Sequence, residues 1–396
     1  MPPTAAAAAH VTASPPLALY VHLPWCLRKC PYCDFNSHEL RGVAALTRAA
    51  ELQYTQALRA DLEAALPMIW GRTVQTVFFG GGTPSLFSAQ AIDDLLVMIR
   101  SLTRLAADAE ITLEANPGTF ERNKFRDFRA AGVNRLSIGV QSFNDVSLLA
   151  LGRVHNASEA MAAIELAATC YDSFNIDLMY GLPGQSLSDL DAELQRLASI
   201  GPPHLSYYNL TLEPNTYFAK FPPALPDDDC IAQMQDLVFE RSAALGLAHY
   251  EVSAYARAGH RAQHNLNYWQ FGDYLGIGAG AHSKLSFHDR ILRQAKYRQP
   301  AKYQEAALAG MAVQEQRQLS NADAAFEFML NALRLREGVA EDLFVERTGL
   351  PISFLSKPIA QALNKGLLEP QPGRLRASDL GFRFLNDLQG LFLADA

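Results

Sequence analysis

The sequence predicts an α/β protein: a partial (β/α)6 barrel followed by a mainly helical, winged-helix-like domain. Two observations predict it. Six apolar, strand-like segments alternate with helical segments through the first half of the chain, which indicates parallel strands joined by βαβ units. From about residue 301 onward the pattern becomes mostly helical. In this chain of 396 residues we expect a disordered tail at 1–16, a barrel core at 17–300 and a helical accessory domain at 301–396.

The six expected strands are short apolar runs bounded by glycine, proline or polar residues. In order, they lie at 17–23, 74–79, 110–114, 135–140, 174–179 and 204–210. Apolar residues at helical spacing predict helices between them at 52–66, 91–102, 120–131, 157–169 and 187–200. Gly132 is expected to stop the third of these helices, and Gly201 with the two prolines after it the fifth.

The C-terminal segment is expected to be a small helical module. Apolar residues recur at helical spacing over 326–335, 354–363 and 380–393. Pro370, Pro372 and Gly373 predict a turn, with a small hairpin, between the last two helices. Winged-helix modules often bind DNA, but this one has scattered acidic residues and no basic recognition helix. We therefore interpret it as a lid or docking domain over the open mouth of the sheet.

Composition and charge exclude several classes of protein. The formal net charge is −7 and the isoelectric point is near 5.8, so there is no excess of cations to neutralise nucleic-acid phosphates. No apolar run is long enough for a transmembrane segment. The first 16 residues are rich in alanine and proline and lack the basic and long apolar parts of a secretory signal. We therefore expect a cytoplasmic protein that does not bind nucleic acid.

Unusual polar and glycine residues lie where the expected strands end. A cysteine-rich segment follows the first strand, and Gly-Gly-Gly-Thr-Pro at 80–84 follows the second. Glu114 closes the third strand, Gln141 follows the fourth, and Asp177 lies near the end of the fifth. In α/β barrels the chemistry gathers at this edge. Each residue alone could be a turn or cap, but five at one edge favour a ligand that partners them.

Three of the five cysteines lie close together as Cys26, Cys30 and Cys33, in the spacing C-x3-C-x2-C. Thiolates bind iron–sulfur clusters, and a four-iron cluster normally takes four of them. The position where a fourth could follow is Phe35, so three local ligands would leave one iron open to a small chelating molecule. A closed zinc site is the alternative, because His38 could be its fourth ligand.

These motifs resemble a known superfamily. C-x3-C-x2-C after a Tyr-Val-His-Leu-Pro strand end resembles the signature of radical S-adenosylmethionine (radical SAM) proteins. Further motifs resemble the anaerobic coproporphyrinogen-III oxidase family in the same order: Gly-Gly-Gly-Thr-Pro at 80–84, Glu-Ala-Asn-Pro at 114–117, Gly-Val-Gln-Ser-Phe at 139–143, Asp-Leu-Met-Tyr-Gly-Leu-Pro-Gly at 177–184 and Gly-Ile-Gly-Ala-Gly-Ala-His-Ser at 276–283. The resemblance runs from about residue 17 to the C-terminus and implies a radical SAM partial barrel.

The resemblance implies a cofactor pair. Cys26, Cys30 and Cys33 would hold a [4Fe–4S] cluster, and the amino and carboxylate groups of S-adenosylmethionine would chelate its open iron. Gly82 and Thr83 would lie against the methionine moiety, where glycine lets the backbone approach a ligand closely. In the superfamily, an electron from the reduced cluster cleaves S-adenosylmethionine to a 5′-deoxyadenosyl radical.

The remaining implied contacts surround S-adenosylmethionine. Glu114 would accept a hydrogen bond from its amino group, and Arg153 would pair with its carboxylate, which suits a guanidinium fork. Gln141 and Asp177 would hydrogen-bond the ribose region. Two tyrosines would line the pocket, Tyr20 and Tyr32.

Two departures from the oxidase pattern point to one branch of that family. Phe35 replaces the last cysteine of the oxidases' C-x3-C-x2-C-x-C, and the arm before the first strand is short. Both features resemble the HemW group of haem chaperones. The resemblance implies a protein that binds haem and delivers it to membrane-bound haem proteins, with an electron donor for the cluster.

The segment at 264–269 reads His-Asn-Leu-Asn-Tyr-Trp and resembles the haem-binding motif of this group. A neutral imidazole from His264 would be a good axial ligand of haem iron, and Tyr268 and Trp269 offer flat apolar faces for a macrocycle. The alternative is that His264 is a buried, hydrogen-bonded histidine and the aromatics are core residues.

Three functions therefore remain open. The first is a haem chaperone with no coproporphyrinogen dehydrogenase activity and no catalytic residue of its own. The second is an oxygen-independent coproporphyrinogen III dehydrogenase that acts by radical oxidative decarboxylation. The third is a radical enzyme with another substrate.

Overall fold

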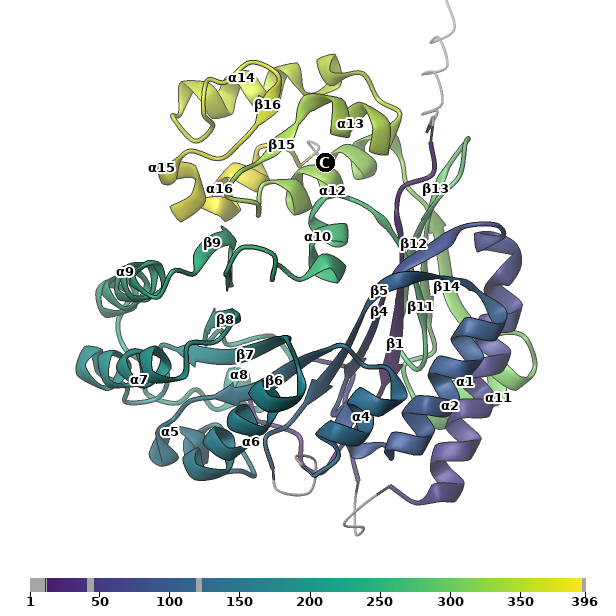
Figure 1. Ribbon diagram of the computed structural model, residues 1–396. Helices are drawn as coiled ribbons and strands as arrows, with labels where there is room; N and C mark the ends of the chain where they lie inside the picture. The colour runs from purple at the N-terminus through teal and green to yellow at the C-terminus, as the bar shows by residue number, and fades with distance from the viewer. Residues whose placement is uncertain (1–10, 12, 41–45, 119–122, 394–396) are drawn as a thin grey trace, which may run out of the picture.

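The computed structural model describes residues 11, 13–40, 46–118 and 123–393, and it contains a strongly curved twelve-stranded sheet (Figure 1). Six of the strands are parallel and adjacent in sequence order: β1 (Leu17–Leu23), β4 (Thr73–Gly81), β5 (Arg104–Ala115), β6 (Arg135–Gln141), β7 (Ser173–Tyr180) and β8 (His204–Asn209). They confirm the predicted partial barrel. Their side chains are mostly buried on both faces, which explains why they read as apolar runs in the sequence.

Helices follow these strands and cover the outer face of the sheet (Figure 1). They are α1 (Arg48–Ile69), η1 (Pro84–Leu86), α2 (Ala89–Leu102), α4 (Phe125–Ala131), α5 (Asp145–Ala150), α6 (Ala157–Cys170), α7 (Leu187–Ile200), α8 (Tyr217–Lys220) and α9 (Asp228–Ala244). The predicted start of the helix at 120–131 falls outside the described residues. Its expected end is confirmed, because Gly132 has the left-handed backbone, φ 112°, that closes α4.

The sequence did not predict the strands that extend the sheet at both edges. On one edge β9 (Ala248–Glu251) and β10 (Ala254–Ala256) pair antiparallel beside β8. On the other edge β11 (Asp273–Ile277) pairs parallel with β1. Three antiparallel strands then follow: β12 (His282–Ser286), β13 (Ile291–Lys296) and β14 (Val313–Gln318). The short helix α10 (Gln263–Trp269) leads from β10 to β11.

The last helical part of the chain has its own core. It comprises α12 (Asn321–Ala332), β15 (Val339–Ala340), α13 (Glu341–Thr348), η2 (Ile352–Leu355), α14 (Ser356–Asn364), β16 (Arg374–Leu375), α15 (Asp379–Arg383) and α16 (Leu385–Gly390). The predicted hairpin is confirmed, because Leu368 bridges Ala377 across the Pro370–Gly373 turn and β16 pairs with β15. Figure 1 shows this layer beside α10 and β9.

The described residues suggest a domain boundary later than 301. Helix α11 (Pro300–Leu308) packs on α1, where the Tyr303 hydroxyl donates to Asp61 at 2.9 Å, and β14 belongs to the large sheet. We therefore propose that the accessory domain begins near residue 319.

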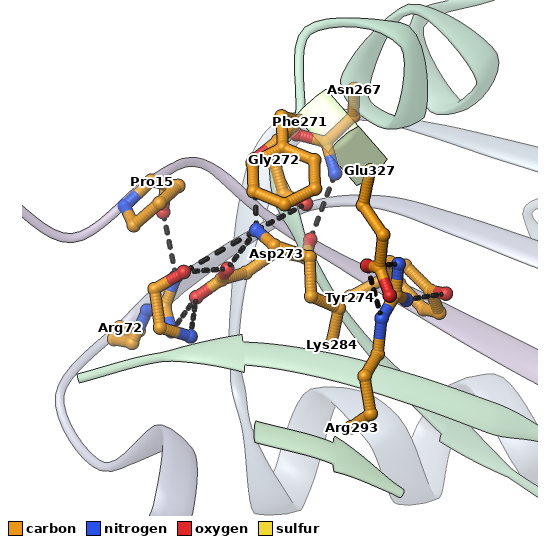
Figure 2. Close-up of polar contacts among 11 residues, drawn as sticks. Pro15, Arg72, Asn267, Phe271, Gly272, Asp273, Tyr274, Lys284, Arg293 and Glu327 are labelled. Atoms are coloured by element: carbon orange, nitrogen blue, oxygen red, sulfur yellow. Dashed lines mark hydrogen bonds and ion pairs between the residues drawn. The ribbon is translucent and has the colours of Figure 1, made fainter. Parts of the chain in front are cut away.

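Most of the expected disordered tail lies outside the described residues. Its described part contacts the fold. Val11 is buried in the core of the C-terminal domain, and the carbonyl of Pro15 accepts a hydrogen bond from Arg72 at 2.6 Å (Figure 2).

Candidate functional site

A cavity of about 400 Å³ opens at the C-terminal ends of the parallel strands. The three clustered cysteines form one side, and residues at or after the ends of β4, β5, β6, β7 and β8 form most of the rest. Ten of the twelve predicted site residues line it: Cys26, Cys30, Tyr32, Cys33, Gly82, Thr83, Glu114, Gln141, Arg153 and Asp177. Cys26 and Asp177, which are 151 positions apart in the sequence, thus line one cavity because parallel strands end at a common edge.

The cysteines lie on a short, tightly folded loop. Cys26 ends the strand β2 (Trp25–Cys26), which pairs in parallel with β3 (His38–Glu39). Between them the amide of Cys33 donates to the carbonyl of Cys30 at 3.1 Å. Burial raises the pKa of Cys26 to about 11 and also raises that of Cys33. These thiols would therefore stay protonated at neutral pH unless a cationic partner stabilised the thiolate.

The glycine run after β4 packs directly against this loop. The amide of Gly82 donates to the carbonyl of Leu23 at 2.9 Å, and that of Thr83 to the carbonyl of Trp25 at 2.8 Å. A β-carbon on Gly82 would lie 2.6 Å from the Trp25 carbonyl oxygen. Glycine is required here because two backbone segments approach closely beside the cysteines.

Two carboxyl groups face the cavity from β5 and β7. Glu114 accepts a hydrogen bond from the amide of Gly81 at 3.1 Å. Asp177 accepts from the hydroxyl of Ser137 and the amide of Asn175, both at 2.8 Å. Burial, with the charge of Asp177 as a smaller cause, raises the pKa of Glu114 to about 8, and burial raises the pKa of Asp177. The pair would be stabilised by a cationic ligand.

Arg153 is the buried cation of this cavity. One terminal nitrogen donates to Asn116 Oδ1 and to the carbonyl of Gly139, both at 2.7 Å, and the other lies 3.5 Å from the sulfur of Cys30. Its Nε atom is buried without a hydrogen-bond partner among the described residues. Such an unsatisfied donor suits an anionic ligand group.

Gln141 carries the backbone strain of the site. It ends β6 with φ 69°, in the left-handed region that non-glycine residues rarely adopt. The turn brings its side chain to the cavity, where Gly139 leaves room beside it and beside Arg153. Strained backbone of this kind is common at ligand sites.

Several lining residues were not predicted. Asn116, which accepts a hydrogen bond from Arg153, lies in the Glu-Ala-Asn-Pro motif but was given no role. Tyr208 and Asn209 end β8, and Thr211 and Glu213 follow it. The strand-end rule that found Glu114 and Asp177 would also have found the residues after the sixth strand. His38, the proposed fourth ligand of a zinc site, is not among the lining residues.

A second cavity of about 680 Å³ adjoins the first and lies against β11, β12 and β13. Asp34, Phe35 and Glu114 line both cavities. Tyr20, predicted for the first pocket, lines the second one, where its hydroxyl lies 3.0 Å from Nδ1 of His22. Phe35 is 61% exposed and lines both cavities, so its ring is not part of a core.

His264 lines neither cavity. It is 1% exposed, and its ring lies 2.7 Å from the hydroxyl of Thr76 and 2.9 Å from that of Tyr268. Burial lowers the pKa of His264 to about 3, so the ring is neutral. Both ring nitrogens are thus engaged within the protein. The idea that His264 ligates haem iron stays a prediction, and it requires one of these two contacts to break so that a ring nitrogen becomes free.

The other aromatic residues of the same motif do reach the second cavity. Tyr268 and Trp269 form part of its wall together with Phe271 and Tyr274. The rings of Tyr268 and Tyr274 are perpendicular, with centroids 4.6 Å apart. Figure 2 shows the polar network behind this wall, in which Lys284 is bonded to Asp273 and Arg293 contacts Tyr274 and Glu327.

Comparisons with known proteins agree with this geometry. Residues 20–197 match the model of the radical SAM superfamily, and residues 319–384 match that of the HemN C-terminal domain. The protein named Heme chaperone HemW of Escherichia coli strain K12 is 46% identical over 383 residues, which cover 96% of this chain and 99% of that one.

The chain belongs to the HemW family of radical SAM proteins.

Two further relatives and one solved structure are also similar to this chain. The Heme chaperone HemW of Haemophilus influenzae is 44% identical, with 96% of this chain and 99% of the relative covered. The mitochondrial radical S-adenosyl methionine domain-containing protein 1 of mouse is 36% identical over 95% of this chain and 87% of its own. Escherichia coli coproporphyrinogen III oxidase, HemN, has the same fold, with a TM-score of 0.81, 23% identity and coverage of 96% and 90%.

No described helix combines the length and the apolar character needed to cross a bilayer.

Proposed function

We propose that this protein is a haem chaperone that acts in the cytoplasm, binds haem together with a [4Fe–4S] cluster and S-adenosylmethionine, and delivers the haem to membrane-bound haem proteins. The observation that carries the proposal is the 46% identity, over nearly the full length of both chains, with a protein named a haem chaperone. Phe35, in place of the oxidases' last cysteine, supports it from the sequence.

The first cavity fits the cluster. Cys26, Cys30 and Cys33 line one side of it, and burial keeps two of these thiols from ionising unless a metal stabilises the thiolate. We propose that they are the three ligands of the cluster. When bound, the cluster would supply one electron to S-adenosylmethionine, and an electron-donor protein would replenish it.

The same cavity fits S-adenosylmethionine. The carboxyls of Glu114 and Asp177 offer hydrogen-bond acceptors to its amino group and its ribose, and Gln141 lies between their strands. Arg153, with one buried donor unsatisfied, would hold the carboxylate. Gly82 and Thr83 would pack on the methionine chain, and Tyr32 would close the pocket beside the cysteines. Each of these residues binds or orients the ligand, and none transfers a proton.

A paired assay tests the function. The protein is purified without oxygen, its cluster is rebuilt, and haem binding is measured by absorption titration. The same preparation is then incubated with coproporphyrinogen III, S-adenosylmethionine and reductant. We expect stoichiometric haem binding, transfer of that haem to an apo-cytochrome in vesicles, and no protoporphyrinogen. Sustained formation of protoporphyrinogen would overturn the proposal in favour of a dehydrogenase.

A further inference from the structure

We propose that haem binds in the second cavity with His282 as the axial ligand of its iron, while His264 positions the cavity wall. The inference rests on the proposed function, and it assigns the place and the ligand of the haem. The cavity of about 680 Å³ lies within the range of ~300–1,000 Å³ that is typical of sites for large organic ligands.

His282 is the histidine in this cavity that can reach a ligand. It begins β12, is exposed, and lines both the cavity and its outer rim. Within the part of the chain that the structure describes, its ring makes no hydrogen bond, in contrast to the ring of His264, which makes two. An imidazole with free nitrogens can donate a lone pair to iron without first breaking a contact.

The strands beside His282 carry small residues. On one side it is paired with Ala295 of β13, which also lines the cavity and whose side chain is a single methyl group. On the other side its carbonyl packs so closely on Gly276 of β11 that a β-carbon there would lie 2.1 Å from the oxygen. Neither neighbouring residue therefore has a large side chain that could cover the imidazole ring.

Neighbouring charges keep the imidazole neutral. Partial burial lowers the pKa of His282, and the guanidinium groups of Arg293 and Arg298 lower it further, against a smaller opposite effect of Glu315. A neutral imidazole is the form that ligates iron.

The rest of the cavity suits the two chemically different parts of haem. Tyr268, Trp269, Phe271 and Tyr274 provide flat apolar faces for the macrocycle. Arg298 is exposed at the cavity and no ion pair with another described residue is found for it, whereas Arg293 and Lys296 are paired with Glu327 and Asp61. Arg298 is thus the cation available to a propionate.

The two hydrogen bonds of His264 indicate that it positions the wall of the cavity and does not bind the iron. Through Nε2 it contacts the hydroxyl of Tyr268, and through Nδ1 it is anchored to Thr76 of β4. It fixes α10 so that Tyr268 faces the cavity. In this account it is a positioning residue, and a side chain with similar hydrogen-bonding capacity should replace it.

Haem titration of the full-length, cluster-loaded protein tests the assignment. The variants are His282→Ala, His264→Gln and, as a control outside both cavities, His260→Ala. We expect His282→Ala to lose the wild-type Soret spectrum and to bind haem about tenfold or more weakly, equal to ~1.4 kcal/mol. Free imidazole should restore its spectrum, because it can occupy the vacated place, and His264→Gln and His260→Ala should match the wild type.

These outcomes distinguish a failure of the proposed function from a failure of the ligand assignment. If the wild type binds no haem, the proposed function itself fails. If the wild type binds haem and His282→Ala has the same spectrum and affinity, the assignment of the ligand fails and the function stands. Loss of the spectrum in His264→Gln alone, with the cluster absorption and circular dichroism unchanged, would make His264 the ligand.

Discussion

Glu114→Gln tests whether the Glu114 carboxyl in the first cavity has a raised pKa when no cationic ligand is bound. Burial and the nearby Asp177 raise the pKa of Glu114 from 4.5 to about 8 in the folded protein without cofactors. Between these values the folded chain keeps a proton that the unfolded chain releases. The stability that this proton confers is fully present below about pH 4.5 and is lost as the pH rises through about 8.

The size of the effect follows from the same values. The interval from 4.5 to about 8, at ~1.4 kcal/mol per pH unit, sets a ceiling of ~5 kcal/mol. Part of the Glu114 side chain remains open to the cavity, so solvent screens the charge and we expect ~2–3 kcal/mol. The glutamine variant keeps an acceptor for the Gly81 amide and cannot ionise.

Urea denaturation at several pH values measures this difference. Wild type and Glu114→Gln, both free of metal and oxygen, should have similar unfolding free energies near pH ~5, and the variant should be more stable by ~2–3 kcal/mol near pH ~9. Titratable groups that are present in both proteins contribute equally to both unfolding free energies, so their contributions cancel in the difference. Parallel curves over this range, or a wild type that gains stability relative to the variant as pH rises, would refute the reasoning.

Three further predictions concern the cluster, the cofactor and the wall of the second cavity. Cys30→Ala should fold but hold little iron and sulfide, because one of three thiolates is missing. Asp177→Ala should bind S-adenosylmethionine roughly tenfold more weakly while keeping its cluster, since a charged hydrogen-bond acceptor is lost. Lys284→Met should lower the unfolding free energy by ~3–5 kcal/mol in urea, because it removes one of the two cations paired with the buried Asp273, of which the other is Arg72.

Each prediction has a matched control. Cys230→Ala, outside both cavities, should keep the iron and sulfide content that Cys30→Ala loses. If Asp177→Ala lost its cluster as well, the change would reflect misfolding instead of a lost ligand contact. Lys365→Met alters an exposed lysine and should change stability by less than ~0.5 kcal/mol. An equal effect of both lysine substitutions would show that the network in Figure 2 contributes nothing.

The barrel strands could be predicted because most of their residues are buried, on both faces of the sheet, and they therefore form predominantly apolar runs. Strand β14 could not be predicted for the opposite reason. Residues Val313–Gln318 are nearly all exposed polar side chains at the sheet edge, without the alternation that marks a half-buried strand. Their position in the sheet depends on pairing with β13, which no pattern within these six residues can indicate.

The candidate site shows the same division. Glu114, Gln141 and Asp177 could be placed together because parallel strands end at one edge. The environment of His264 could not be foreseen, because its partner Thr76 lies 188 residues away in the sequence. Tyr268 of the same motif lines the second cavity, and its role toward haem stays a prediction.

The claim on which the account most depends is that three thiolates hold a cluster with one iron open to S-adenosylmethionine. The direct measurement is the electron paramagnetic resonance spectrum of the reduced, anaerobically rebuilt protein with and without S-adenosylmethionine. We expect a [4Fe–4S] signal that shifts when S-adenosylmethionine is added, and no shift in Cys30→Ala. A protein that holds only zinc, or a cluster signal that is indifferent to S-adenosylmethionine, would contradict the account.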